Sequence, residues 1–172
     1  MEIHQNHDAW VKTFQERWLA EFQKTGMCDW SIYERPRNHT PVPGKGIDLA
    51  SSRLMLISSA GAYLAGKQAP FDAANLLGDY TIRVFSPETP FDRLAYAHEH
   101  YDHSAVNADP QVLLPLGHLG AMAAEGKVGK LTAVVSFMGY QPDVSRVLDE
   151  TIPAILQVAR DENADAALLV PA

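Results

Sequence analysis

The sequence predicts an α/β fold: a mostly parallel sheet flanked by helices in a three-layer, Rossmann-like architecture, with an N-terminal amphipathic helix. Three observations lead to this prediction. Short apolar runs of strand length alternate with helix-sized intervals, and an early segment has helical periodicity. The chain has 172 residues with 47% hydrophobic content, which suits one core. We therefore expect a single α/β domain over residues 1–172, with a helix and extended arm at 1–47 and a core at 48–172.

Residues 8–25 have the apolar spacing of a helix, because four aromatic residues recur every four positions. These residues are Trp10, Phe14, Trp18 and Phe22. Asp8 is the expected N-cap and Gly26 the expected end of this helix. The aromatic stripe predicts either a core contact or a face for another subunit. Prolines and glycines across residues 32–46 then predict an extended connection.

The remainder of the chain supplies the elements of the predicted sheet. Five runs read as strands: Arg53–Ser58, Thr81–Ser86, Leu94–Ala97, Leu131–Phe137 and Ala166–Val170. Two segments, Pro115–Glu125 and Pro142–Asn163, read as helices, and Pro153 is expected to bend the second. In parallel sheets ligands bind beyond the carboxyl ends of the strands. We therefore expect residues 58–59, 98–103, 137–140 and 172 to meet at one rim.

Charge and cysteine content exclude several classes of function. Fourteen Lys and Arg against 21 Asp and Glu give a net charge of −7, which opposes binding to nucleic acid or to an anionic membrane. Cys28, the single cysteine, allows neither an internal disulfide nor a zinc site made of several thiolates. No apolar run approaches the ~20 residues that a membrane span needs, and no signal pattern opens the chain. A cytoplasmic protein is therefore expected.

Imidazoles and a carboxylate are concentrated directly after one predicted strand. The cluster consists of His98, His100, Asp102 and His103. Its form, HxHxDH, resembles the first metal-binding motif of metallo-β-lactamase-like hydrolases, in which zinc activates water. Those enzymes need further ligands far downstream, whereas the only later histidine here is His118. We expect no metal, with a site at His98, His100 and His103 as the alternative; a loop of surface histidines is a further alternative.

An ordered set of short segments resembles the selenoprotein B family of glycine, sarcosine, betaine and D-proline reductases. These segments are residues 58–63, 70–72, 77–83, 98–102, 107–110, 114–115, 125–131, 136–142 and 165–172. The resemblance implies reductive cleavage of a C–N bond in a small amino acid or N-methylated amine. It implies a selenocysteine or cysteine directly after Ala172, a thiol reductant protein, and a pyruvoyl group on a partner subunit. It also implies a homo-oligomer or a complex with a partner reductase subunit.

The resemblance assigns roles to residues of the predicted rim. His98, His100 and His103 would donate protons to a leaving amine or stabilise a selenolate, and Asp102 would orient one imidazole. The expected substrate-binding residues are Ser58, Ser59, Gly61, Tyr63, Phe137, Gly139 and Tyr140. Ser58 and Ser59, with nearby backbone N–H groups, would hold the substrate carboxylate.

Three readings of the function stay open from the sequence alone. The chain ends where the redox residue is expected, so the 172-residue form is expected to lack turnover. A non-catalytic ligand-binding or scaffold homologue is the first alternative to the reductase. A metal-dependent hydrolase is the second.

Overall fold

The computed structural model describes residues 5–38, 44 and 46–172. Residue contacts divide the chain into two compact units, one made of 1–45 with 143–145 and the other of 46–142 with 146–172. The predicted extended connection at 32–46 is described only at 32–38, 44 and 46, where no helix or strand forms. In the described residues, no helix is long and apolar enough to cross a membrane.

The first unit contains the predicted N-terminal helix. It runs without a break through α1 (His7–Thr13), a π-helical stretch (Phe14–Leu19) and α2 (Ala20–Thr25). The N-cap is Asn6 rather than the predicted Asp8, because asparagine tolerates the left-handed φ of 55° found there. Asp8 instead lies in the first turn, where a negative charge is favourable. Gly26, with φ of 69°, ends the helix as predicted.

The aromatic stripe of this helix forms the core of the first unit. Trp10, Phe14 and Trp18 are 6%, 5% and 1% exposed. Neighbouring rings stack along the helix, with centroids 4.9 Å apart for Trp10–Phe14 and 5.4 Å for Phe14–Trp18. Trp30 and Tyr33 pack against the Trp18 ring from the segment that follows. The stripe is therefore a core contact within this unit, which is the first of the two predicted readings.

The second unit is built on β1 (Arg53–Ser58), the centre of a five-stranded sheet. One edge of β1 pairs in parallel with β7 (Ala166–Val170). The other edge pairs in parallel with β5 (Lys130–Leu131) and then with β6 (Val134–Phe137). The predicted strand over 131–137 is thus two strands, interrupted at Thr132 and Ala133. A mostly parallel α/β sheet was the sequence prediction, and it is confirmed.

Two predicted strands lie outside the parallel part of the sheet, and for one of them, 94–97, the predicted place is wrong. β3 (Ile82–Phe85) pairs antiparallel with β6, because no helix in residues 65–81 provides the crossover that a parallel partner needs. The predicted strand at 94–97 does not join this sheet. It forms β4 (Leu94–Tyr96), which pairs antiparallel with the unpredicted β2 (Ala62–Leu64) in a separate two-stranded sheet.

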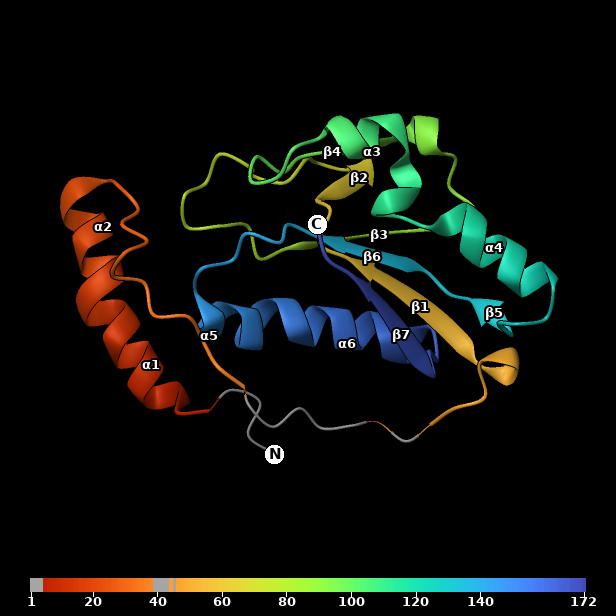
Figure 1. The fold of residues 1–172 in the computed structure, drawn as a ribbon, viewed down its shortest axis with the longest axis horizontal. Helices are drawn as coiled ribbons and strands as arrows, with labels where there is room; N and C mark the ends of the chain where they lie inside the picture. The colour runs from red at the N-terminus through yellow and green to blue at the C-terminus, as the bar shows by residue number, and fades with distance from the viewer. Residues whose placement is uncertain (1–4, 39–43, 45) are drawn as a thin grey trace. The chain divides into compact units, whose positions relative to one another are not determined.

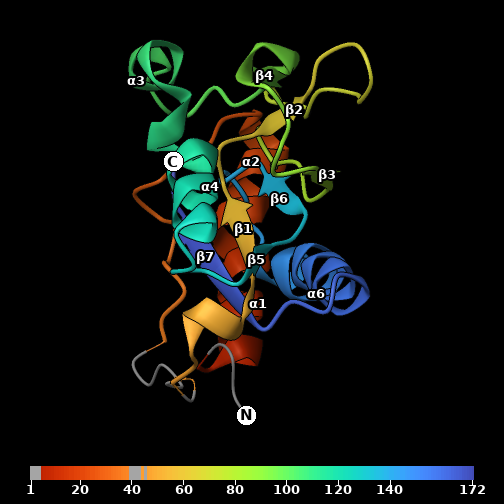
Figure 2. The ribbon, with the colours of Figure 1, turned by 90° about the vertical axis from the view of Figure 1, so that its right-hand side faces the viewer.

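Helices cover both faces of the main sheet. Leu54 and Leu56 of β1 pack in the cluster that contains Leu116 and Leu119 of α4 (Leu116–Ala124). On the opposite face, Met55 and Ile57 pack with residues of α6 (Ile152–Asp161). Figures 1 and 2 show α4 and α6 on opposite sides of β1. The alternation of side chains along a strand therefore produces the predicted three layers.

The remaining elements connect these layers. α6 continues from α5 (Val144–Arg146) through a π-helical stretch (Val147–Thr151). This irregular turn precedes Pro153, which lacks the N–H that a regular helix would use there. α3 (Ser104–Ala108) follows the histidine segment. Short 3₁₀ turns occupy Leu49–Ser51, Phe91–Arg93 and Pro110–Val112.

Candidate functional site

The carboxyl ends of β1, β6 and β7 meet around Ser59. The backbone N–H of Ala172, after β7, donates to Ser59 Oγ at 2.8 Å. The N–H of Gly139, after β6, donates to the Ser59 carbonyl at 3.2 Å. Figure 1 places the C-terminus at this end of the sheet. Three of the four segments expected to converge therefore do so, because parallel strands end at the same edge.

The fourth segment, the histidine loop, reaches the same edge by a different route. It follows β4, and β4 is held beside the main sheet through β2 rather than within it. Gly61 makes this approach possible. It has φ of +65°, and a Cβ there would lie 2.6 Å from the Ala97 carbonyl oxygen and 3.0 Å from the Cβ of His98. The Ala97 N–H donates to the Gly61 carbonyl at 2.9 Å. The loop is thus fixed against the strand ends by backbone contacts.

His98 is the buried member of the cluster. It is 5% exposed, and its Nδ1 accepts a hydrogen bond from the His100 backbone N–H at 3.1 Å. Burial, with the nearby His100 and His103, lowers the pKa of His98 to about 4. His98 is therefore neutral near pH 7, and its ring proton is on Nε2 because Nδ1 acts as an acceptor. Nε2 lies 3.4 Å from the position that a Cβ on Gly139 would occupy, so it faces the rim.

His103 and Tyr101 hold the loop in place. His103 Nε2 donates to the His98 carbonyl at 2.6 Å, since a carbonyl can only accept. The Tyr101 hydroxyl donates to the Ala60 carbonyl at 2.9 Å, and its ring lies 4.8 Å from that of His98. Burial, with Tyr96 nearby, raises the pKa of Tyr101 to about 12. Sequence reasoning missed Tyr101, although its place between His100 and Asp102 was a usable signal.

His100 is the exposed imidazole of the rim. Its ring stands edge-on to Tyr140, with centroids 3.7 Å apart and an angle of 83° between the planes. Tyr140 is itself fixed, because its hydroxyl donates to the Leu76 carbonyl at 2.9 Å. These two residues bring the predicted histidine loop and the predicted segment after β6 into contact.

Asp102 has a local partner instead of the imidazole that was expected. Its two carboxylate oxygens accept from the Ser104 N–H at 2.9 Å and the Ser104 hydroxyl at 2.7 Å. These two bonds, with a smaller contribution from the nearby His103, lower the pKa of Asp102. An aspartate that bonds the residue two positions ahead is a turn and capping arrangement. Both described bonds of the carboxylate therefore go to Ser104, the first residue of α3, and none goes to an imidazole.

The predicted cradle of serine and backbone N–H groups after β1 is also corrected. The Ser58 hydroxyl is fully buried and donates to the Leu113 carbonyl at 2.9 Å. The N–H groups that follow all have acceptors in the chain. These are Ser59 to Val170, Ala60 to Ser58 Oγ, Gly61 to Phe137 and Ala62 to Ser136 Oγ. Of this segment, the Ser59 side chain is the part that lies at the rim.

Two further predicted substrate-binding residues belong to other parts of the fold. Phe137 packs with the core cluster on the α6 face of the sheet, next to Met55 and Ile57. Tyr63 lies in β2 opposite Ala95. In the described part of the chain, the Tyr63 side chain makes no hydrogen bond to the rim. Of the expected substrate-binding residues after β6, Gly139 and Tyr140 are thus the ones next to the histidine loop.

The described histidines do not form a cluster of metal ligands. Across residues 5–38, 44 and 46–172, no group of three or more His, Cys, Asp or Glu residues could hold a metal ion. His98 Nδ1 and His103 Nε2 are both used in hydrogen bonds within the loop. This geometry gives no support to the hydrolase alternative.

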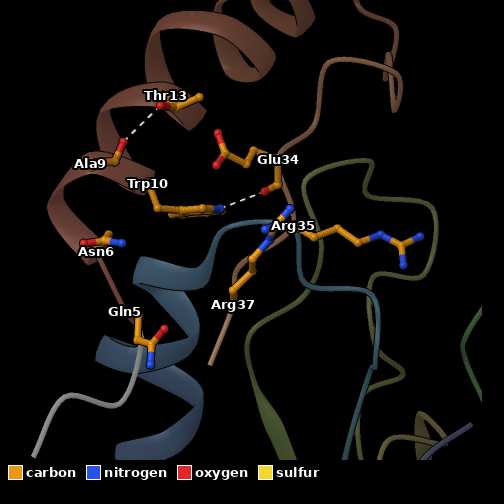
Figure 3. Close-up of a pocket in the computed structure, with 8 residues that line it drawn as sticks. All are labelled: Gln5, Asn6, Ala9, Trp10, Thr13, Glu34, Arg35 and Arg37. Atoms are coloured by element: carbon orange, nitrogen blue, oxygen red, sulfur yellow. Dashed lines mark hydrogen bonds between the residues drawn. The ribbon is translucent and has the colours of Figure 1, made fainter. Parts of the chain in front are cut away.

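A separate cavity of about 220 Å³ lies in the first unit and contains none of the predicted site residues. Figure 3 shows Trp10 reaching from the helix to the following segment, where its Nε1 donates to the Glu34 carbonyl at 2.8 Å. The side chains of Arg35 and Arg37 point in different directions in this view. They do not form a paired clamp for one anion.

Fold and geometry thus define an α/β protein with a histidine-bearing rim at the carboxyl ends of its parallel strands. A curated relative is the D-proline reductase subunit gamma of Acetoanaerobium sticklandii, which is 28% identical over 123 residues. The match covers 71% of this chain and 49% of the relative, so the chain spans about half the length of that relative. No protein-family model matches, and no solved structure gives a significant match. The chain is therefore a distant homologue of a reductase subunit.

Proposed function

We propose that this chain is a subunit of an amino-acid reductase complex of the selenoprotein B type. The complex would cleave a C–N bond in a small amino acid or its N-methylated relative. The observation that carries the proposal is the hydrogen bond from Ala172 to Ser59, at the rim that His98 faces. Whatever residue follows Ala172 begins beside these side chains. The distant similarity to a D-proline reductase subunit gives independent support.

The proposed reaction needs a strong nucleophile and two electrons. A selenocysteine or cysteine after Ala172 attacks the carbon that carries the nitrogen, a carbon–chalcogen bond forms, and the amine leaves with a proton. A second thiol then attacks the chalcogen. The carbon leaves with the electron pair and takes up a proton, and a bond between sulfur and the chalcogen remains. A thiol reductant protein reduces that bond and restores the starting state.

The three histidines have different roles in this proposal. His98 is neutral near pH 7, so it serves as a hydrogen-bond donor rather than as an acid. His100 is exposed at the rim and in contact with solvent, which suits transfer of a proton to the leaving amine. His103 positions His98 through the bond to its carbonyl. A pyruvoyl group on a partner subunit would hold the substrate amine.

The nucleotide sequence after codon 172 tests the proposal directly. An in-frame UGA or cysteine codon, followed closely by another cysteine codon, is the expected result. Any other sense codon would contradict the catalytic proposal. It would favour the alternative of a scaffold or ligand-binding homologue.

Turnover provides the second test. The full chain, assembled with its partner subunit and a dithiol, is expected to reduce D-proline or a related amino acid, with one dithiol oxidised for each amino acid. Replacing the residue after Ala172 with serine should abolish this activity. His100→Gln should lower turnover, whereas His118→Gln, at an exposed histidine on α4, should not. Equal turnover of the two histidine variants would remove the role proposed for His100.

A further inference from the structure

Two hydrogen-bond donors at the rim face the same small space above Gly139. A Cβ on Gly139 would lie 3.1 Å from Ser59 Oγ and 3.4 Å from His98 Nε2. The same Cβ would lie 3.0 Å from Ser59 Cβ, so a side chain at residue 139 would crowd both donors, and glycine leaves them uncovered. Gly139 is itself exposed, so this space opens to solvent.

His98 supplies the first donor. The residue is 5% exposed, and its Nδ1 is already an acceptor for the His100 N–H. The proton of the neutral ring is consequently on Nε2. Within the described residues, this Nε2 has no hydrogen-bond partner. Nε2 is not among the buried atoms that lack a partner, so it is reachable from solvent, and a ligand or water at the rim can accept its hydrogen bond.

Ser59 supplies the second donor. Its Oγ accepts from the Ala172 N–H at 2.8 Å, which orients the oxygen. The hydroxyl proton has no acceptor among the residues that the structure describes. It is thus available to a group above Gly139.

We propose that His98 Nε2–H and Ser59 Oγ–H together bind a small carboxylate in the space above Gly139. A carboxylate only accepts hydrogen bonds, so two converging donors match it. The titratable neighbours that act on His98 are His100 and His103, which are neutral or positive and therefore do not repel an anion. Asp102 is a carboxylate of this loop, and its described hydrogen bonds are to Ser104 rather than to the two donors.

The identity of the natural ligand rests on the proposed function. Every amino-acid substrate of such a reductase carries an α-carboxylate, and the site would hold that group while the residue after Ala172 attacks the neighbouring carbon. This assignment differs from the expected cradle of Ser58 and backbone N–H groups, which the fold uses internally.

A titration by nuclear magnetic resonance tests the site without turnover. The 172-residue chain is prepared with a C-terminal amide, so that the carboxylate of Ala172 does not compete. Acetate is the probe, and acetamide, of similar shape but neutral, is its control. Acetate is expected to shift the His98 Nε2 and attached proton resonances with saturation. Acetamide at the same concentration is expected to leave them unchanged.

Variants locate the binding. Ser59→Ala should weaken acetate binding roughly tenfold, as expected for the loss of one charge-assisted hydrogen bond. Gly139→Ala should abolish it, because the methyl group fills the space between the donors. Gly120→Ala, at an exposed position of α4 with nothing within 4 Å of the added Cβ, is the matched control and should bind normally.

Three results would overturn the proposal: no saturable shift, equal responses to acetate and acetamide, or unchanged binding in Gly139→Ala. Failure here is distinguishable from failure of the proposed function. A complex that reduces amino acids although acetate does not bind at His98 would contradict the site alone. Binding at His98 in a chain whose full complex has no reductase activity would contradict the proposed function alone.

Discussion

The backbone N–H of Ala172 donates to the Oγ of Ser59 at 2.8 Å, across a separation of 113 positions in sequence. This bond joins the end of the edge strand β7 to the end of the central strand β1. Ser59 also accepts from Gly139 through its carbonyl, so one residue connects the ends of three parallel strands. The rim is consequently part of the sheet's own hydrogen bonding, and changes to it are expected to affect stability as well as binding.

The buried neutral His98 predicts that stability depends on pH. Its folded-state pKa is about 4, against about 6.5 for an exposed histidine. Between about pH 4 and pH 6.5 the unfolded chain therefore binds more protons than the folded chain does. From this group, the free energy of unfolding should rise with pH through that window, by up to about 3 kcal/mol in total, and stay constant above it.

Urea unfolding from about pH 4 to pH 7 measures this dependence. His98→Gln keeps an amide donor but removes the titration, so its free energy of unfolding should depend less on pH than that of the natural chain. His118→Gln, at an exposed histidine, should follow the natural chain. Parallel curves for the natural chain and His98→Gln would show that His98 is not held neutral by folding.

Gly61 leads to a second prediction, a loss of stability on substitution that depends on close contact rather than on charge. Gly61 and Gly66 both have positive φ, +65° and +71°, so alanine is strained at either position. A Cβ at Gly61 also meets the Ala97 carbonyl oxygen at 2.6 Å, whereas nothing lies within 4 Å at Gly66. Gly61→Ala should therefore destabilise the chain by roughly 2 kcal/mol more than Gly66→Ala does, measured by urea unfolding. Equal losses would mean that the histidine loop can move away from the strand ends.

Several elements could be predicted because the residues that identify them are close together in the sequence. The run of four apolar residues in Arg53–Ser58 identified β1 with its bounds, and the four-residue aromatic spacing identified the N-terminal helix. The meeting of strand ends around Ser59 also followed, since it depends only on parallel pairing.

The parts that could not be predicted depend on contacts between distant residues. β2 and β4 are three residues each, and their pairing depends on the positive φ of Gly61 and on its close approach to residues 97 and 98. Similarly, the sequence does not reveal that Phe137, Val170 and Ser136 accept the N–H groups that were expected to bind substrate. The roles of His98, His100 and His103 in chemistry stay predictions.

Asp102 provides a third prediction, which separates a capping role from a catalytic one. Asp102→Ala should speed hydrogen exchange of the Ser104 amide, because its acceptor is lost. The tautomer of His98, read from the nitrogen resonances of the ring, should not change. Asp109→Ala is the matched control, since Asp109 accepts from the Gln111 N–H at 2.9 Å in the same way. A changed His98 tautomer in Asp102→Ala alone would restore the role of orienting an imidazole.

Ser58 and Ser59 make the fourth prediction, because these neighbours differ in burial. The Ser58 hydroxyl is fully buried, and its removal leaves the Leu113 carbonyl without that donor and the Ala60 N–H without that acceptor. Ser58→Ala should therefore cost about 1–3 kcal/mol of stability. Ser59→Ala should cost less than about 1 kcal/mol, since water can reach the exposed Ala172 N–H that it releases.

Urea unfolding of the two variants measures the difference, and Ser136→Ala is the internal comparison. Ser136 is also fully buried, and its Oγ accepts from the Ala62 N–H at 2.8 Å. Ser136→Ala should therefore lose about as much stability as Ser58→Ala. The affinity for acetate should show the opposite order: it should fall in Ser59→Ala and stay unchanged in Ser58→Ala. Weaker acetate binding in a fully folded Ser58→Ala variant would mean that the Ser58 hydroxyl reaches the ligand after all. The assignment of the rim to Ser59 and His98 would then fail.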